Sequence, residues 1–189
     1  MAELQLHRDE DTALAVRART DRAAFGALFD RWLPKIYGYI YKRIGHRETA
    51  EDLASRAFEK AMAGIGSFDP ARGSWSSWMY RIATNVLFDH YRSNKDASLL
   101  EEDAAEQVPS KEDLNALVDR GFTAAAVRGA MEKLPERYRT ALALRFFEER
   151  TTEEMTEILQ VSRGTLAVLV HRSLKALGRV LTDDGTPTV

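Results

Sequence analysis

The stretch SWSSWMYRIATNVLFDHYR, residues 74–92, gathers the side chains that are best suited to contact unpaired bases. The chain has three tryptophans in 189 residues, and this stretch holds two of them, with a phenylalanine, two tyrosines and two arginines. On a helix, where each residue turns by about 100 degrees, one face collects a packing stripe. That face carries Trp75, Trp78, Met79, Ile82 and Val86.

The opposite face of the same predicted helix combines aromatic rings with arginines. Aromatic rings stack on single-stranded bases for ~1–3 kcal/mol per base, while arginines hold the phosphates. Opening a duplex costs about 1.4 kcal/mol per base-pair step, so capture of a few flipped bases would offset local melting. The alternative is that Phe88 and Tyr91 pack on a neighbouring helix. This face carries Tyr80, Thr84, Phe88 and Tyr91, flanked by Arg81 and Arg92, with Asn85 at its border.

Residues for catalysis or metal binding do not form a comparable pattern. The four histidines are scattered and none has a second ligand at HxxxH or HxxE spacing, which argues against a metal site. No GK[ST] motif follows a glycine-rich loop, and Asp89 and His90 are helix neighbours that point apart. We therefore expect no enzyme activity, no catalytic residue, no cofactor and no metal.

Helical periodicity predicts the elements that position these residues. An apolar stripe at three-four spacing runs from Phe25 to Tyr41, with Thr20 or Asp21 as its cap and Gly45 as its end. Pro34 lies inside this stripe and is expected to bend the helix or remove one hydrogen bond. A shorter helix precedes it, at about 11–18, and another amphipathic run covers 48–63. Four helices with short connections predict a small all-α domain.

Charge and composition divide the chain. Residues 1–96 have a net charge of +2, residues 97–122 of -5, and residues 123–182 of +3. The acidic segment has weak periodicity and reads as a linker. No cysteine, apolar leader or membrane-length run is present, so we expect a cytoplasmic protein without membrane insertion.

The C-terminal block has the length pattern of a helix-turn-helix. Thr151 and Glu154 form a capping box for a helix over 152–159, residues 160–164 form a turn, and Ser162 caps a helix that reaches about 181. A plain helical hairpin is the alternative. The flank that could reach DNA carries Arg163, Gly164, Thr165, Val168, His171, Arg172 and Lys175.

Taken in order, the motifs resemble the sigma factors of bacterial RNA polymerase, specifically the extracytoplasmic-function (ECF) group. They are DRAAFGALFDRWLPKIYGY, AEDLASRAFEKAM, SWSSWMYRIATNVLFDHYR, LPERYRTALALRFF, TEEMTEIL and VSRGTLAVLVHRSLKAL. The resemblance implies an all-α fold with two helical domains. Sigma region two would cover 11–95, the acidic linker 96–122, region four 123–182 and a flexible tail 183–189.

The resemblance also implies partners and site residues. Region two would bind the clamp helices of the largest polymerase subunit and melt the minus-ten element, and region four would contact the flap of the second largest subunit and read the minus-thirty-five element. The linker would thread near the RNA exit path, and an anti-sigma factor is a further partner common in the family. Minus-ten contacts would come from Arg81, Asn85 and the loop with Phe68, Asp69, Ala71, Arg72 and Gly73. Core contacts would come from Glu51, Asp52, Leu53, Ser55, Arg56, Phe58 and Glu59, although Leu53 and Phe58 also suit a core.

Several residues depart from the family pattern, among them Ser55, which stands where the family often has a glutamine. Arg56 stands where the family usually has an acid, and Thr156 and Gln160 replace a small alanine and a turn glycine. Ala167 replaces a basic residue near the start of the reading helix. Two alternatives follow: an independent helix-turn-helix regulator, which needs neither the aromatic helix nor the docking helix, and a polymerase-binding adaptor that does not bind DNA.

Overall fold

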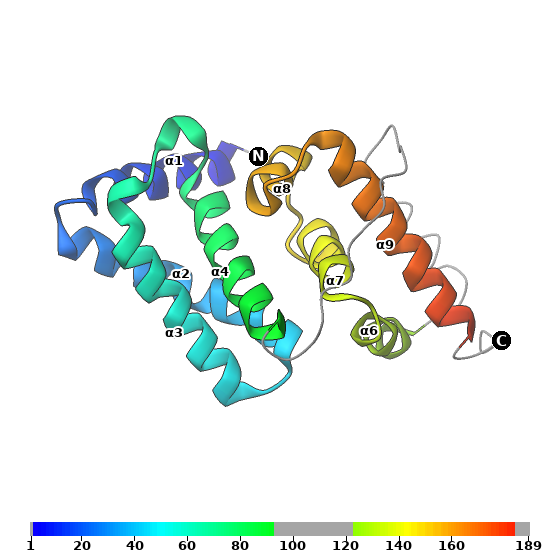
Figure 1. The fold of residues 1–189 in the computed structure, drawn as a ribbon. Coiled ribbons are helices and arrows are strands. Elements are labelled where there is room, and N and C mark those ends of the chain that lie inside the picture. The colour runs from blue at the N-terminus through cyan, green and yellow to red at the C-terminus, as the bar shows by residue number, and fades with distance from the viewer. Residues whose placement is uncertain (1, 93–122, 184–189) are drawn as a thin grey trace. The chain divides into compact units, whose positions relative to one another are not determined.

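The computed structural model describes residues 2–92 and 123–183, and these residues form helices without any strand. One compact unit is built from α1 (Ala2–Arg17), α2 (Arg22–Ile44), α3 (Arg47–Gly64) and α4 (Trp75–Arg92). The other is built around α6 (Ala124–Glu132), α7 (Glu136–Leu142), α8 (Thr152–Leu159) and α9 (Arg163–Asp183), as Figure 1 shows. The predicted all-α class is confirmed. The predicted linker, residues 96–122, lies outside the described residues.

The ends of α2 are set by local chemistry. The Asp21 side chain accepts a hydrogen bond from the Ala23 amide at 2.9 Å, and Gly45 ends the helix in the left-handed conformation with φ 71°. The backbone N–H groups of Ala24 and Ala23 lower the pKa of Asp21 because they stabilise its carboxylate. The helix continues through Pro34. Both predicted ends are therefore confirmed.

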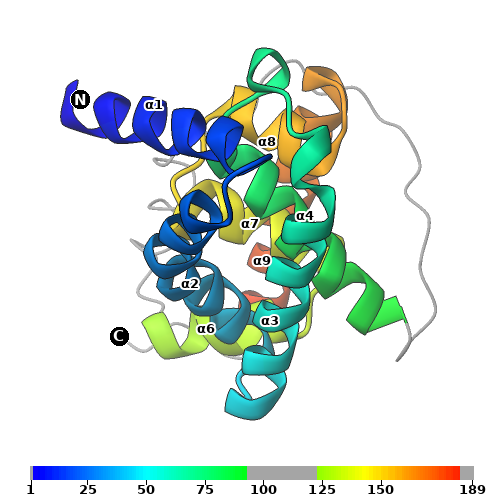
Figure 2. The ribbon, with the colours of Figure 1, turned by 90° about the vertical axis from the view of Figure 1, so that its left-hand side faces the viewer.

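The core of the first unit lies between α2, α3 and α4, which pack against one another. α1 crosses their ends and contacts α2 and α4, as the turned view in Figure 2 shows. α4 is thus covered by three helices, which explains why its buried arc is wide. The loop between α3 and α4 contains two short 3₁₀ turns, η1 (Ile65–Ser67) and η2 (Pro70–Arg72). The largest buried side chains of this unit include Leu28, Ile36, Tyr39, Ile40, Leu53, Phe68, Trp75, Met79 and Tyr80.

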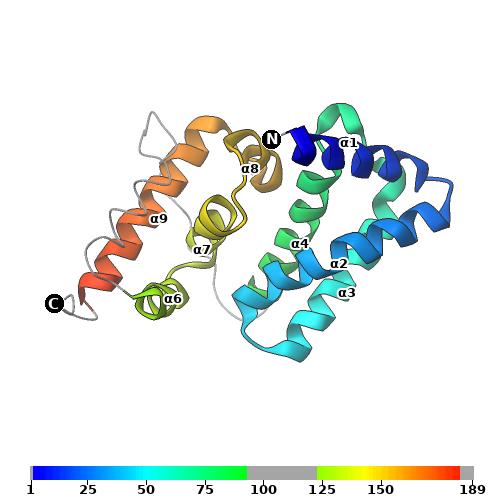
Figure 3. The same ribbon diagram turned by 180° about the vertical axis from the view of Figure 1, so that it is seen from behind.

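The second unit is organised around α9, which packs against α6 and α7 (Figure 3). α7 continues into a π-helical turn, η3 (Ala143–Phe147). The predicted capping box at α8 is present: the Thr151 amide donates to the Glu154 carboxylate at 2.9 Å, and the Glu154 amide donates to the Thr151 hydroxyl at 3.2 Å. Gln160 ends α8 with φ 54° and ψ 46°. It therefore adopts the left-handed geometry that glycine usually supplies.

Candidate nucleic-acid interface

α4 presents a narrow accessible strip along its length. Trp78, Arg81 and Ile82 are half-buried, and Asn85, Asp89 and Arg92 are exposed. These residues recur every three or four positions, so they line one side of the helix. The structure therefore brings the predicted Arg81, Asn85 and Arg92 together on one strip. It also adds Trp78, Ile82 and Asp89, the first two of which the helical wheel assigned to the packing face.

Tyr80 was predicted on the DNA face, and the structure contradicts this. Its side chain is only 1% exposed. The ring lies edge-on to Tyr39 and to Trp32, with centroids 5.1 and 6.3 Å apart. Thr84 is buried beside it and hydrogen-bonds the Tyr39 hydroxyl at 3.0 Å. Tyr80 is a core residue because α2 covers the side of α4 that the wheel left open.

Phe88 and Tyr91 have an intermediate position. Both side chains are half-buried. The Tyr91 hydroxyl donates to the backbone carbonyl of Arg43 at 3.0 Å, which ties the end of α4 to the end of α2. Packing on a neighbouring helix, the alternative to stacking, therefore accounts for Tyr91 in this structure. Base stacking by Phe88 stays a prediction.

The loop before α4 contains one buried side chain, Phe68, followed by exposed residues. Phe68 was predicted to contact DNA, but its side chain is 1% exposed and lies edge-on to Trp75 and Trp78, at 6.0 and 5.6 Å. Asp69 caps η2 by accepting from the Ala71 amide at 3.0 Å. Gly73 has φ 150° and ψ 169°, a conformation almost restricted to glycine. The exposed members of the predicted loop set are Asp69, Ala71 and Arg72.

The outer face of α3 carries most of the residues predicted to bind polymerase. Leu53 and Phe58 are exceptions, at 0% and 3% exposed. The Phe58 ring packs edge-on against Phe29 at 4.9 Å, so these two residues belong to the core. Met62 is 50% exposed although its apolar character suggested the packing side. The exposed residues of the prediction are Glu51, Asp52, Ser55, Arg56 and Glu59.

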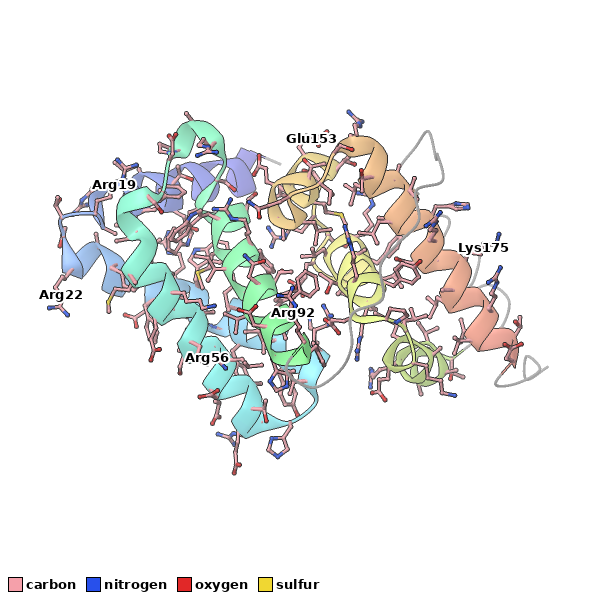
Figure 4. All side chains as sticks on the ribbon, in the orientation of Figure 1. Arg19, Arg22, Arg56, Arg92, Glu153 and Lys175 are labelled. Carbon is pink, nitrogen blue, oxygen red and sulfur yellow. The ribbon has the colours of Figure 1, made fainter. Side chains whose placement is uncertain are left out.

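Two basic residues of this face, Arg56 and Lys60, each lie close to a carboxylate. The Arg56 guanidinium lies 4.0 Å from the Asp52 carboxylate, and both side chains are open to solvent. Figure 4 shows Arg56 on the outer side of α3. At the other end of the helix, Lys60 pairs with Asp89 of α4 at 3.1 Å. The α3 face is therefore mixed in charge rather than simply acidic.

The start of α9 carries the predicted reading residues. The Ser162 hydroxyl accepts from the Thr165 amide at 3.1 Å, which confirms Ser162 as the cap. Thr165, Val168 and Arg172 are half-buried. Lys175 lies further along the helix and projects outward (Figure 4). The fully exposed members of the predicted set are Arg163, Gly164, His171 and Lys175.

Ala167 does not belong to this exposed surface of α9, whereas Glu153 of α8 lies close to it. Ala167 is 1% exposed, so it packs in the core and could not present a basic side chain outward without moving α9. Glu153 of α8, labelled in Figure 4, lies 3.8 Å from the Arg163 guanidinium. The carboxylate thus faces a residue predicted to contact DNA. The sequence pattern did not predict this contact, because Glu153 and Arg163 lie on opposite sides of the turn between α8 and α9.

Two kinds of feature are absent from the described part of the chain. Within residues 2–92 and 123–183, no group of three or more histidine or acidic side chains is arranged to hold a metal ion. Among the helices of this described part, none is long and apolar enough to cross a bilayer.

Comparison with known proteins follows the same division of the chain. The family model of sigma-70 region 2 matches residues 28–97, and that of sigma-70 region 4 matches residues 124–177. The chain is 34% identical to the ECF RNA polymerase sigma factor SigW of Bacillus subtilis, over 86% of this chain and 91% of that protein. It is 30% identical to the ECF sigma factor BldN of Streptomyces coelicolor, over 93% and 69%.

Solved structures agree at the level of the fold. CnrH, solved in complex with the cytosolic domain of CnrY, has a TM-score of 0.66 at 21% identity, over 93% of this chain and 99% of that one. RpoE of Bartonella quintana, solved with the anti-sigma factor NepR, has a TM-score of 0.58 at 20% identity, over 85% and 98%. The chain belongs to the sigma-70 family. Within that family it is a sigma factor of the ECF group, which acts in promoter-specific initiation of transcription.

Proposed function

We propose that the chain binds RNA polymerase core through the outer face of α3, captures melted minus-ten bases on α4 and its preceding loop, and reads the minus-thirty-five duplex with α9. The observation that carries this proposal is the accessible strip of α4, where Arg81, Asn85 and Arg92 share one side. Surface helices commonly expose a polar side, but on this side arginines stand beside accessible aromatic and apolar side chains, the combination that binds single-stranded DNA. Trp78 and Phe88 supply accessible aromatic surface near it.

In this proposal polymerase performs all chemistry, and the chain supplies promoter choice and strand capture in the cytoplasm. The boundaries 11–95 and 123–182 are proposed as the functional domains, with 96–122 as the acidic linker. Contact of region four with the flap of the second largest subunit and regulation by an anti-sigma factor stay predictions that rest on the family alone. The independent regulator explains only α8 and α9, so it leaves the strip on α4 without a role.

Run-off transcription with purified core polymerase and a library of genomic promoters tests the proposal. We expect initiation that depends on core polymerase and is confined to a defined set of promoters. Stable binding to core without initiation would favour the adaptor instead. Specific duplex binding by the protein alone, with no effect on polymerase, would favour the independent regulator.

Glu153→Gln is expected to tighten binding of the minus-thirty-five duplex by roughly two- to five-fold at low salt. The change removes a negative charge 3.8 Å from Arg163 and so leaves that guanidinium available to a phosphate. The size follows from the ~0.2–1 kcal/mol typical of exposed ion pairs. Duplex affinity of the polymerase-bound protein, measured at several salt concentrations, checks it. Glu132→Gln on α6 is the control, and an equal gain in both variants would contradict a local effect.

A further inference from the structure

The loop between α3 and α4 and the first residue of α4 are hydrogen-bonded to a segment outside the family match. The match to sigma-70 region 2 begins at residue 28. Thr12 of α1 and Arg19, just after α1, lie before that point, yet both contact backbone atoms at the two ends of residues 68–75. These contacts span 49 and 63 positions of sequence. The exposed loop residues predicted to hold flipped bases lie between them.

Thr12 satisfies a backbone donor at the start of α4. The first amides of a helix have no partner inside the helix. The Ser74 hydroxyl accepts from the Ser77 amide at 3.2 Å, and the Ser74 carbonyl accepts from the Trp78 amide at 3.1 Å. The Trp75 amide instead donates to the Thr12 hydroxyl oxygen at 3.3 Å. Thr12 thus fixes the point where the loop turns into α4.

Arg19 fixes the other end of the loop. Its guanidinium donates to the backbone carbonyl of Phe68. The Phe68 ring is buried against Trp75 and Trp78, so the residue is held through its side chain and through its carbonyl. A donor that carries a charge makes a stronger hydrogen bond than a neutral one. Asp69 follows directly and is exposed, as are residues 70–72, whereas residue 73 is half-buried.

The segment that makes these contacts is itself held firmly. The Asp11 carboxylate is buried and accepts from the Trp32 indole at 2.9 Å and from the Arg31 guanidinium. Ala15 and Ala18 are 0% and 7% exposed, so the inner side of this segment lies in the core. The segment 11–19 is thus hydrogen-bonded both to α2 and to the two ends of residues 68–75, so it fixes the loop relative to α2.

We infer that Thr12 and Arg19 are positioning residues for minus-ten capture, which hold the loop 68–75 in the shape that receives flipped bases. This inference rests on the proposed function, in which Asp69, Ala71 and Arg72 lie close to those bases. Neither Thr12 nor Arg19 needs to touch DNA. Their loss lowers promoter opening without lowering core binding or duplex binding by α9.

Matched variants test this inference in the full-length protein bound to core polymerase. Thr12→Val keeps the shape and removes the acceptor, whereas Thr12→Ser keeps the hydroxyl. Arg19→Met removes the donors, whereas Arg19→Lys keeps a charged donor. Arg22→Met is the control for charge, because Arg22 is exposed at the first turn of α2, three residues after Arg19, and both are labelled in Figure 4. Melting temperature and affinity for core are measured for every variant.

Two readouts decide the outcome. Hydrogen exchange of the segment 65–78 in the free protein reports on the loop, and 2-aminopurine placed in the minus-ten element reports on opening. We expect Thr12→Val and Arg19→Met to exchange faster there and to open promoters roughly 5- to 10-fold more slowly. Thr12→Ser and Arg19→Lys should recover most of the rate, and Arg22→Met should match the wild type.

The result that overturns the inference differs from the one that overturns the proposed function. If Arg72→Ala slows opening while Thr12→Val and Arg19→Met do not, α1 has no positioning role although the loop contacts DNA. If the serine and lysine variants fail to recover the rate, the hydrogen bonds are not the cause and the inference is wrong. If the wild-type holoenzyme opens no promoter, the proposed function fails and the positioning role fails with it.

Discussion

Trp75→Ala is expected to destabilise the unit of α1 to α4 by about 3–5 kcal/mol, the range typical of removing a large buried aromatic side chain. Trp75 is 0% exposed and its ring contacts Phe68 and Trp78 at 6.0 and 5.3 Å. Removal of the indole would leave a cavity where the loop meets α4. Because this position is buried, the cavity accounts for part of the expected loss of stability. Urea unfolding followed by circular dichroism measures the change.

Two further variants test whether the buried volume of the Trp75 ring is the cause of this loss of stability. Trp75→Phe should cost clearly less than Trp75→Ala, since the buried indole nitrogen has no hydrogen-bond partner among the described residues and its removal breaks no bond. Trp78→Ala should also cost less, because Trp78 is half-buried. An equal loss for Trp75→Ala and Trp78→Ala would contradict the burial pattern of α4.

Arg81→Ala is expected to slow open-complex formation by roughly 10- to 100-fold while leaving the melting temperature nearly unchanged. The expected size corresponds to loss of a hydrogen bond to a charged group, about 1.5–3 kcal/mol. Arg81 lies half-buried on the accessible strip of α4, where it can reach a phosphate without leaving the helix surface. Permanganate footprinting of the minus-ten element, combined with thermal melting of the free protein, measures both effects.

The control for Arg81→Ala is Arg17→Ala. Arg17 is exposed and pairs only on the surface, with Asp21 at 3.2 Å, so its removal changes net charge equally without touching α4. We expect it to open promoters at the wild-type rate. If Arg81→Ala unfolds the unit as Trp75→Ala does, the separation of α4 into a packing side and a DNA side is wrong.

Local signals allowed several features to be predicted from the sequence. The cap at Asp21, the left-handed end at Gly45, the capping box of Thr151 and Glu154 and the cap at Ser162 are all present. The helix over 152–159 has the predicted bounds. Each of these features depends on groups within four residues of one another: a capping side chain and the amide it satisfies, or the Gly45 amide and the Tyr41 carbonyl. Such contacts are therefore encoded in neighbouring positions of the chain.

The accessible side of α4 was predicted less well. A helical wheel groups Tyr80 with Phe88 and Tyr91 because it considers one helix alone. In the folded unit α1, α2 and α3 all contact α4, so both Tyr80 and Thr84 become buried. Trp78 and Ile82 become partly accessible. Hydrophobicity alone could not show which aromatic residues of α4 are buried and which are accessible, since aromatic residues serve equally well in a core and in base stacking.

The sequence by itself determined the family, the two helical blocks, both ends of α2 and α8 and the start of α9, because ordered motifs and capping residues are local properties of the chain. The start of α1 was predicted wrongly, since this helix begins at Ala2 and not near residue 11. The tertiary structure alone decided that Phe68 and Tyr80 are core residues, that Glu153 faces Arg163, and that Thr12 and Arg19 reach the loop before α4. Burial depends on which helices cover a face, and these hydrogen bonds join positions up to 63 residues apart. Neither is visible until the helices are packed.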